Sequence, residues 1–179
     1  MILVQEILRD VVKRVSDNLH IDINYQCGDA NYVCKQLDIM SRTAGAESIK
    51  YPLFVVYMPI VEDKTDPTCY CKVSLKILIA TLSDKGFCYE QRLEYSFKGL
   101  LHPIYEEFIK ELKKDNRLKQ EYADFIPHTY TDNYQYGFYG TKTSDNQVFD
   151  TIDGIDITNL KLTVKYERIC EKLSHGRKV

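Results

Sequence analysis

Two strand-like stretches, residues 51–61 and 70–81, constrain the fold of this chain more than any other feature. The first is an almost continuous apolar run that contains Pro52 and Pro59 near its two ends. It is too short for a typical buried helix and is predicted to be a central strand. In the second stretch apolar residues alternate with Lys and Ser, which is typical of a half-buried strand. Because a single loop joins them, the two are predicted to pair antiparallel.

Two amphipathic helices are predicted to accompany this sheet. Residues 2–19 place their apolar side chains on one stripe, and residues 100–114 repeat apolar side chains at helical spacing and end in lysines that suit the helix dipole. The first helix is expected to pack in the core of its own subunit, with packing on a neighbouring chain as the alternative. Residues 21–25 are expected to form a short strand and residues 31–40 a short helix. Residues 87–97 fit either an extended or a helical conformation.

The closing stretch, residues 155–166, contains a phase slip in its alternation. Its apolar side chains fall into two sets of opposite parity: Ile155 with Ile157, and Leu160 with Leu162, Val164 and Tyr166. A β-bulge near Thr158 and Asn159 would keep both sets on one face, because one extra residue restores the register. The pattern therefore predicts a bulged strand.

Together these elements predict an α+β fold, mainly an antiparallel β-sheet packed by an N-terminal helix and a central helix. The chain has 179 residues, an ordinary size for one hydrophobic core. Residues 1–170 are therefore expected to form a single domain, and residues 171–179 a polar C-terminal tail that frays in an isolated subunit.

Charge and composition exclude several classes of protein. The hydrophobic content of 44% and charged content of 28% are typical of globular proteins. No apolar run approaches the roughly 20 residues needed to cross a bilayer, and early charges interrupt the apolar start before it could form a signal-peptide core. The protein is therefore expected to be made and kept in a cytosol, without a membrane partner. Its net charge of -2 gives no global basic excess of the kind common in proteins that live on duplex DNA.

No residue pattern predicts a catalytic, cofactor-binding or metal site, so the protein is expected not to be an enzyme. The sequence lacks a phosphate-cradling Gly-Lys-Ser/Thr loop and a three-glycine dinucleotide fingerprint. Cys69 and Cys71 have no second closely spaced ligand pair that would complete a zinc site. The aspartates between residues 145 and 156 have the wrong spacing for an EF-hand and are explained by turns and caps.

Residues 122–139 have a high aromatic density for a polar segment. Exposed aromatic residues at this density indicate an interface. The alternative is a β-hairpin whose tyrosines pair across strands and are half-buried on the domain surface. Both interpretations stay open, and an acidic loop at residues 62–67 is a second candidate contact. The candidate interface residues are Tyr130, Tyr134, Tyr136, Phe138, Tyr139, Glu62, Asp63 and Asp66.

Six segments carry a resemblance to a known group of proteins. They are the N-terminal helix, Tyr-Pro-Leu-Phe at 51–54, the acidic turn at 62–67, Cys-Tyr-Cys-Lys-Val at 69–73, Leu-His-Pro-Ile-Tyr at 101–105 and Ile-Asp-Gly-Ile-Asp-Ile at 152–157. In this order, over about residues 2–166, the chain resembles small phage and prophage proteins of the tail-completion (tail-terminator) or head-to-tail connector type.

The resemblance implies a non-enzymatic structural protein of the virion, assembled in the cytoplasm of a bacterial host. Such a protein is a subunit of a homo-oligomeric ring, six-fold or twelve-fold, that joins portal, neck and tail proteins while duplex DNA only passes through its lumen. A head-to-tail ring needs two unlike faces on each subunit. The aromatic segment and the acidic loop are the candidates for those faces.

The alternative function is a module that binds single-stranded nucleic acid by stacking bases on the tyrosines. It would need a basic groove beside the aromatic segment. Lys142 is the only clear cation next to that segment, and several aspartates surround it. The alternative therefore ranks second, and a small enzyme third.

Overall fold

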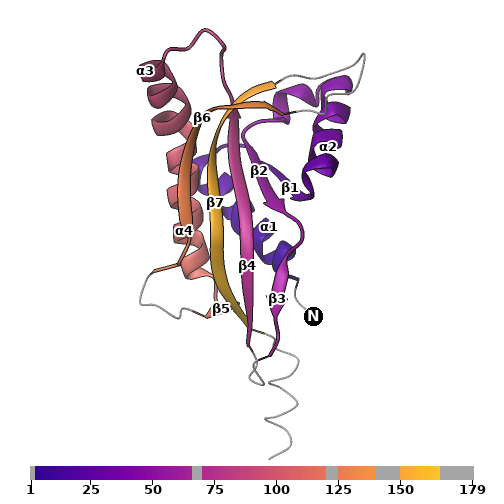
Figure 1. Ribbon diagram of the computed structural model, residues 1–179, viewed down its shortest axis with the longest axis vertical. Helices are drawn as coiled ribbons and strands as arrows, with labels where there is room; N and C mark the ends of the chain where they lie inside the picture. Colours follow the sequence, from indigo (N-terminus) through magenta and orange to yellow (C-terminus); the bar gives the residue numbers. More distant parts are fainter. Residues whose placement is uncertain (1–2, 66–69, 120–124, 140–149, 166–179) are drawn as a thin grey trace, which may run out of the picture.

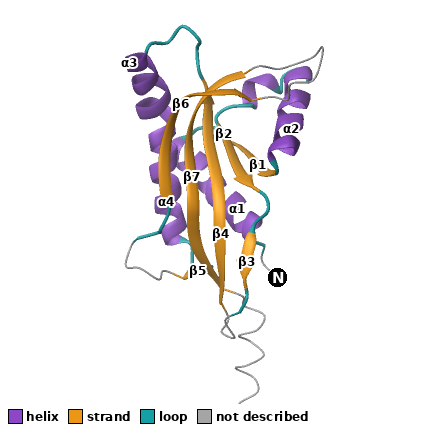
Figure 2. Ribbon diagram, in the orientation of Figure 1, coloured by secondary structure: helices purple, strands orange, loops and turns teal. Residues whose placement is uncertain are grey.

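The computed structural model describes residues 3–65, 70–119, 125–139 and 150–165, without the side chains of 135–139. It confirms the predicted α+β class, with one seven-stranded sheet and helices against both of its faces (Figure 1, Figure 2). The strands are β1 Asn24–Gly28, β2 Leu53–Tyr57, β3 Val61–Asp63, β4 Tyr70–Leu82, β5 Leu118–Lys119, β6 Thr129–Tyr139 and β7 Asp150–Lys165.

The sheet is mostly antiparallel, as predicted. Its strand order is β1-β2-β4-β7-β5, with β3 beside β4 and β6 beside β7. The predicted antiparallel pairing of the two strand-like stretches is present between β2 and β4. The pair β1 and β2 is parallel, because the chain returns through a helix between these strands.

Helices lie on both faces of this sheet. They are α1 Val4–Leu19, α2 Ala30–Arg42, η1 Glu47–Ile49, α3 Tyr89–Gln91, η2 Arg92–Leu101 and α4 His102–Lys114. The main core joins α1, η2 and α4 to one face, and a smaller core joins α2 to the other. In the part of the chain that is described, no helix combines the length and the apolar character that a membrane span requires.

The helix α1 packs in the core of its own chain, as predicted from its apolar stripe. Six of its side chains are at most 2% exposed: Val4, Ile7, Leu8, Val11, Val12 and Val15. The predicted short helix is α2, which begins after Asp29, whose carboxylate accepts a hydrogen bond from the Tyr32 amide at 2.8 Å. This N-cap satisfies a backbone donor that the first turn leaves unpaired.

Residues 87–97, which the sequence left open, are helical from Tyr89 onward and lead directly into α4. The stretch η2 is a π-helix, and its last turn closes with the His102 amide donating to the carbonyl of Phe97. Pro103 follows at once and has no amide hydrogen to donate. A proline at this point is compatible with a widened turn, so the helix continues through it.

The strand predicted at residues 51–61 is divided in two, which corrects the sequence interpretation. It ends at Tyr57, and after Pro59 the chain forms the separate strand β3, which pairs with residues 72–74 of β4. The prediction of a loop at Glu62 and Asp63 is therefore wrong, because β4 is long enough to hold β3 beside its lower end. Asp66 lies outside the described residues.

The predicted bulge in the closing strand is confirmed. Leu160 pairs with Leu75, and Ile157 pairs with Ile77, so Thr158 and Asn159 together oppose one residue of β4. Asn159 has a φ of 53°, in the left-handed region that asparagine tolerates. The two sets of opposite parity consequently reach the same core: Ile155, Ile157, Leu160, Leu162 and Val164.

Candidate functional site

The described tyrosines of the aromatic segment pack against the chain's own helices. The strand β6 pairs with β7, and no hairpin forms within residues 125–139. The ring of Tyr130 lies 4.7 Å from that of Tyr105, and the ring of Tyr134 lies 4.4 Å from that of Phe97. Both tyrosines are half-buried and pack on the main core. Much of their surface is therefore already used inside the subunit.

A polar network fixes the same strand to α4. The Tyr130 hydroxyl donates to Asp132, and His102 Nε2 lies 3.4 Å from both carboxylate oxygens of Asp132. The hydroxyl of Tyr105 lies 2.7 Å from His128 Nε2. Burial first, and then the hydrogen bond to Asp132, raise the pKa of Tyr130 above its usual value. Tyr130 therefore stays a neutral donor that orients β6 on the helix.

The remaining predicted interface aromatics lie farther along β6. Phe138 pairs with Thr151 and Tyr139 with Asp150, after an irregularity in register that includes Tyr136. The side chains of these three residues lie outside the described part of the structure. The strand nonetheless brings all five predicted aromatics onto one edge of the sheet.

The predicted acidic contact lies on the other side of the sheet, on and beside β3. Glu62 accepts a hydrogen bond from Lys64 at 2.7 Å, and Asp63 accepts one from the Thr65 hydroxyl at 2.7 Å. The hydrogen bonds from Thr65 lower the pKa of Asp63. The two predicted contact segments are thus separated by β4 and β7 and do not form one site.

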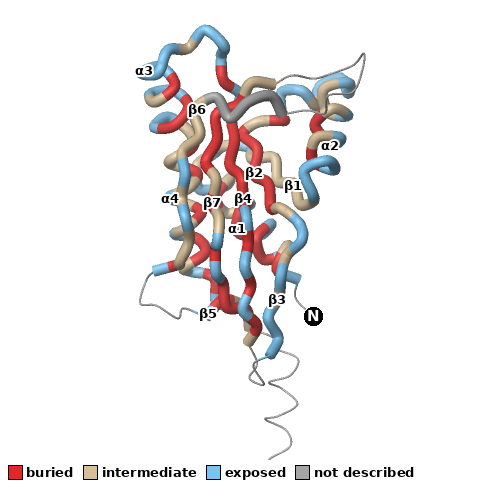
Figure 3. The backbone as a smooth tube through the Cα atoms, viewed as in Figure 1, coloured by how far each residue is buried: buried red, intermediate tan, exposed pale blue. Residues whose placement is uncertain are grey.

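A surface that the sequence reasoning missed lies on the sheet face opposite the main core. The helix α2 covers the part of this face near β2, whereas the lower halves of β4 and β7 carry alternating exposed residues (Figure 3). Five lysines stand there, and we call them the lysine face: Lys72, Lys76, Lys119, Lys161 and Lys165.

Strand register places four of these lysines around one threonine. Thr163 pairs with Lys72 on β4 and with Lys119 on β5. Lys161 and Lys165 stand two positions away on either side of it along β7. Neighbouring strands are about 5 Å apart, and two residues span about 7 Å of a strand. The four lysine backbones therefore all lie within about 7 Å of Thr163.

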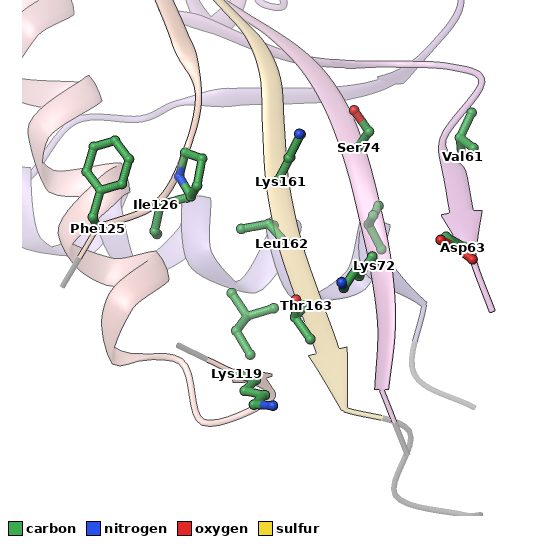
Figure 4. Close-up of a pocket in the computed structure, with 13 residues that line it drawn as sticks. Val61, Asp63, Lys72, Ser74, Lys119, Phe125, Ile126, Lys161, Leu162 and Thr163 are labelled. Carbon is green, nitrogen blue, oxygen red and sulfur yellow. The ribbon is translucent and has the colours of Figure 1, made fainter. Parts of the chain in front are cut away.

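A groove of about 320 Å³ opens on this face. Its lining comes from β3, β4, β7, β5 and the residues that precede β6 (Figure 4). The side chains of Val61 and Phe125, which are 64% and 61% exposed, contribute to it from its two sides. Asp63 is the only carboxylate among the described residues that line it.

Lys165 donates to the carbonyl oxygen of Asn116, and two other lysines of this face lie over aromatic rings. The amine of Lys76 lies 5.2 Å from the ring centre of Tyr57, and that of Lys119 lies 4.6 Å from that of Tyr70. The five lysines and Asp63 together carry a charge of +4. Because the net charge of the whole chain is -2, all other residues together carry -6.

The sequence contained one signal for this surface. Lysines occupy the polar positions of the alternating stretch at residues 70–81 and also of the closing strand. Overall composition hid this pattern, because acidic residues elsewhere in the chain cancel the charge. Only the pairing of β4 with β7 and β5 brings these lysines together.

In the described ranges, no three His, Cys, Asp or Glu side chains form a group that could hold a metal ion. No protein-family model matches the chain, and no curated protein matches it.

Proposed function

We propose that this protein is a non-enzymatic structural subunit of a phage neck or tail, which forms a ring that joins portal and tail components. The observation that carries the proposal is the presence of two unlike edges on one sheet, β1 on one side and β6 on the other (Figure 1). Ring closure requires that one patch of a subunit meet a different patch of the next copy.

The edge at β6 is well suited to accept a neighbouring chain. Among the described strands, β6 pairs only with β7, so its outer side presents backbone donors and acceptors. The strand Thr129–Tyr139 contains neither lysine nor proline, the residues that commonly protect an exposed edge from pairing. A strand or loop of the next subunit could extend the sheet there.

The order of elements also supports the proposal. The resemblance to tail-completion and connector proteins depends on a helix, a strand, an acidic turn, a second strand, a second helix and a closing strand in sequence. The structure has the helices and strands of this order as α1, β2, β4, α4 and β7, with β3 at part of the acidic turn. In the proposed setting the protein belongs to the virion, and duplex DNA passes through the ring.

The test is the mass of the purified protein across a concentration series, measured by light scattering, followed by electron microscopy of any multimer. We expect a discrete ring for the unmodified chain. The variant Thr129→Lys with Thr131→Lys adds charge to two exposed positions of the β6 edge and should shift the protein toward a monomer.

The matched control is Thr43→Lys with Ser48→Lys, which adds the same charge at exposed positions outside β6, at the end of α2 and in η1. It should assemble like the unmodified chain. Equal assembly of the edge variant would remove the β6 edge from the contact. A chain that stays monomeric at every concentration would contradict self-assembly into a ring.

The alternative of single-strand binding on the tyrosine segment has less support. Tyr130 and Tyr134 use their rings for contacts with Tyr105, Phe97 and Tyr89, which lie on the chain's own helices. The concentrated positive charge lies on the lysine face, on the other side of the sheet from these contacts.

A further inference from the structure

We propose that the lysine face binds the phosphate backbone of duplex DNA. The inference rests on the proposed function only for the source of the DNA, which would be the duplex that passes through the ring. It adds a contact that the ring alone does not require, because DNA can pass through a lumen without touching a dedicated surface.

The first argument is the crowding of like charges. Lys72, Lys119 and Lys161 lie around Thr163, at separations comparable to the Debye length of about 8 Å in physiological salt. No two of these lysines are directly opposite, because Thr163 pairs with Lys72 and Lys119 and Ser74 pairs with Lys161, but their charges still repel one another at these separations. The described lining of the groove supplies only Asp63 to offset them. A dense polyanion would offset the remaining charge.

The second argument is the chemical type of the cations. Among the described residues, this face carries lysines and no arginine. Arginine has a planar fork that matches carboxylate and phosphate alike, whereas lysine acts as a point charge toward either anion. The hydroxyl groups of Ser74 and Thr163 stand between the lysines, and hydroxyl groups commonly donate to phosphate oxygens. Lysines with hydroxyl groups between them fit the closely spaced phosphates of a nucleic-acid backbone.

The third argument distinguishes duplex from single-stranded DNA. Proteins that bind single strands without sequence preference stack bases on several exposed rings. On this face the amines of Lys76 and Lys119 lie over the rings of Tyr57 and Tyr70. Among the described residues that line the groove, Phe125 is the one strongly exposed ring. One ring is a poor stacking platform, so contact with the backbone of a duplex is favoured.

The experiment is a titration of a fluorescent 30-base-pair duplex of random sequence, followed by anisotropy at several salt concentrations. We expect the affinity to fall steeply with salt, because binding through phosphates releases counterions. The variant Lys72→Gln with Lys161→Gln should weaken binding at least about tenfold and reduce the slope of log K against log salt by about 2.

The matched control is Lys13→Gln with Lys98→Gln, which removes the same charge from exposed positions of α1 and η2. It should bind duplex DNA like the unmodified chain. Thermal melting of each variant establishes that it is folded. A parallel titration uses one strand of the same length, alone and with Phe125→Ala.

The outcomes are distinct. Selective weakening in the Lys72 and Lys161 variant supports the proposal. Equal duplex affinity in that variant and the unmodified chain overturns it, and so does equal weakening in the control. Tighter binding of the single strand, lost in Phe125→Ala, also overturns it. Light scattering of the same samples separates this result from the proposed function, because DNA binding can fail while rings form, and rings can fail while DNA binds.

Discussion

Arg92 of η2 and Asp153 of β7 form an ion pair whose side chains are only 3% and 0% exposed. The guanidinium nitrogen Nη1 lies 2.9 Å from the Asp153 carboxylate and 2.6 Å from the Ser83 hydroxyl. The other guanidinium nitrogens donate to the carbonyl oxygens of Phe87 and Asp84. This cluster attaches the start of the long helix to the upper end of the sheet.

The variant Arg92→Met should lose about 3–5 kcal/mol of unfolding free energy, because it leaves the Asp153 carboxylate buried without its cation. Urea unfolding followed by circular dichroism measures this loss. Arg42→Met is the control, since the Arg42 and Asp38 side chains are 55% and 34% exposed, and it should cost at most about 1 kcal/mol. Adding Asp153→Leu to Arg92→Met should recover part of the stability. No recovery would contradict the assignment of the loss to the broken ion pair between Arg92 and Asp153.

Leu75→Asp should prevent folding. Leu75 is 3% exposed and belongs to the main core, so a carboxylate there would be buried among apolar side chains at a cost of at least about 4 kcal/mol. Ser74→Asp is the matched control on the adjacent, solvent-facing position. Far-ultraviolet circular dichroism of the two variants is the measurement. A folded and soluble Leu75→Asp protein would contradict the assigned face of β4.

The bulge in β7 predicts that one substitution of Asn159 destabilises the fold and that another leaves its stability nearly unchanged. Asn159→Val should lose about 1–2 kcal/mol, because a β-branched side chain is strained at a φ of 53°. Asn159→Gly should change stability by less than about 0.5 kcal/mol, since glycine adopts this conformation freely. Thermal unfolding compares the two. Equal losses would indicate that the Asn159 side chain matters more than its backbone conformation.

Asp115 predicts a pH dependence of stability. Burial of Asp115 raises its pKa, but hydrogen bonds from Arg117 and Arg14 outweigh burial and lower the pKa to about 2. Because the folded pKa lies below the ordinary value of 3.8, the ionised carboxylate stabilises the fold above about pH 4, and this contribution is lost as the pH falls toward 2.

Asp115→Asn should therefore lose about 1–2 kcal/mol at pH 7, an estimate reduced for solvent screening, and should match the unmodified chain near pH 2. Unfolding free energies across this range provide the comparison. Asp17→Asn removes the same charge at an exposed position of α1 and is the matched control. A difference between Asp115→Asn and the unmodified chain that is independent of pH would indicate lost packing instead of lost charge.

Local periodicity was enough to predict α1, α4, the strands β2, β4 and β7, and the bulge, but it left the region of α3 and η2 open. Side chains alternate between the two faces of a strand, so Ile157 and Leu160 can share a face only if an extra residue lies between them. This deduction needs the sequence of that strand alone. The stripe of α1 is equally local, since burial follows from helical spacing alone.

The features that the sequence did not predict depend on partners distant in the chain. The strand β3 exists because β4 extends past the end of β2, and Tyr134 is half-buried because Phe97 lies opposite it. The lysine face requires the order of β4, β7 and β5 across the sheet. The net charge of the chain combines the positive charge of this surface with the negative charge of the other residues. The separation of the two charges therefore becomes visible only in the folded structure.

The bulge at Thr158 and Asn159 also divides β7 into two lengths that can evolve separately. The length before it pairs with β6, and the length after it pairs with β5 and carries Lys161 and Lys165. Each length keeps its own alternation, so mutations in one need not be compensated in the other. The aromatic edge beside β6 and the lysine half beside β5 therefore belong to two separately registered parts of one strand.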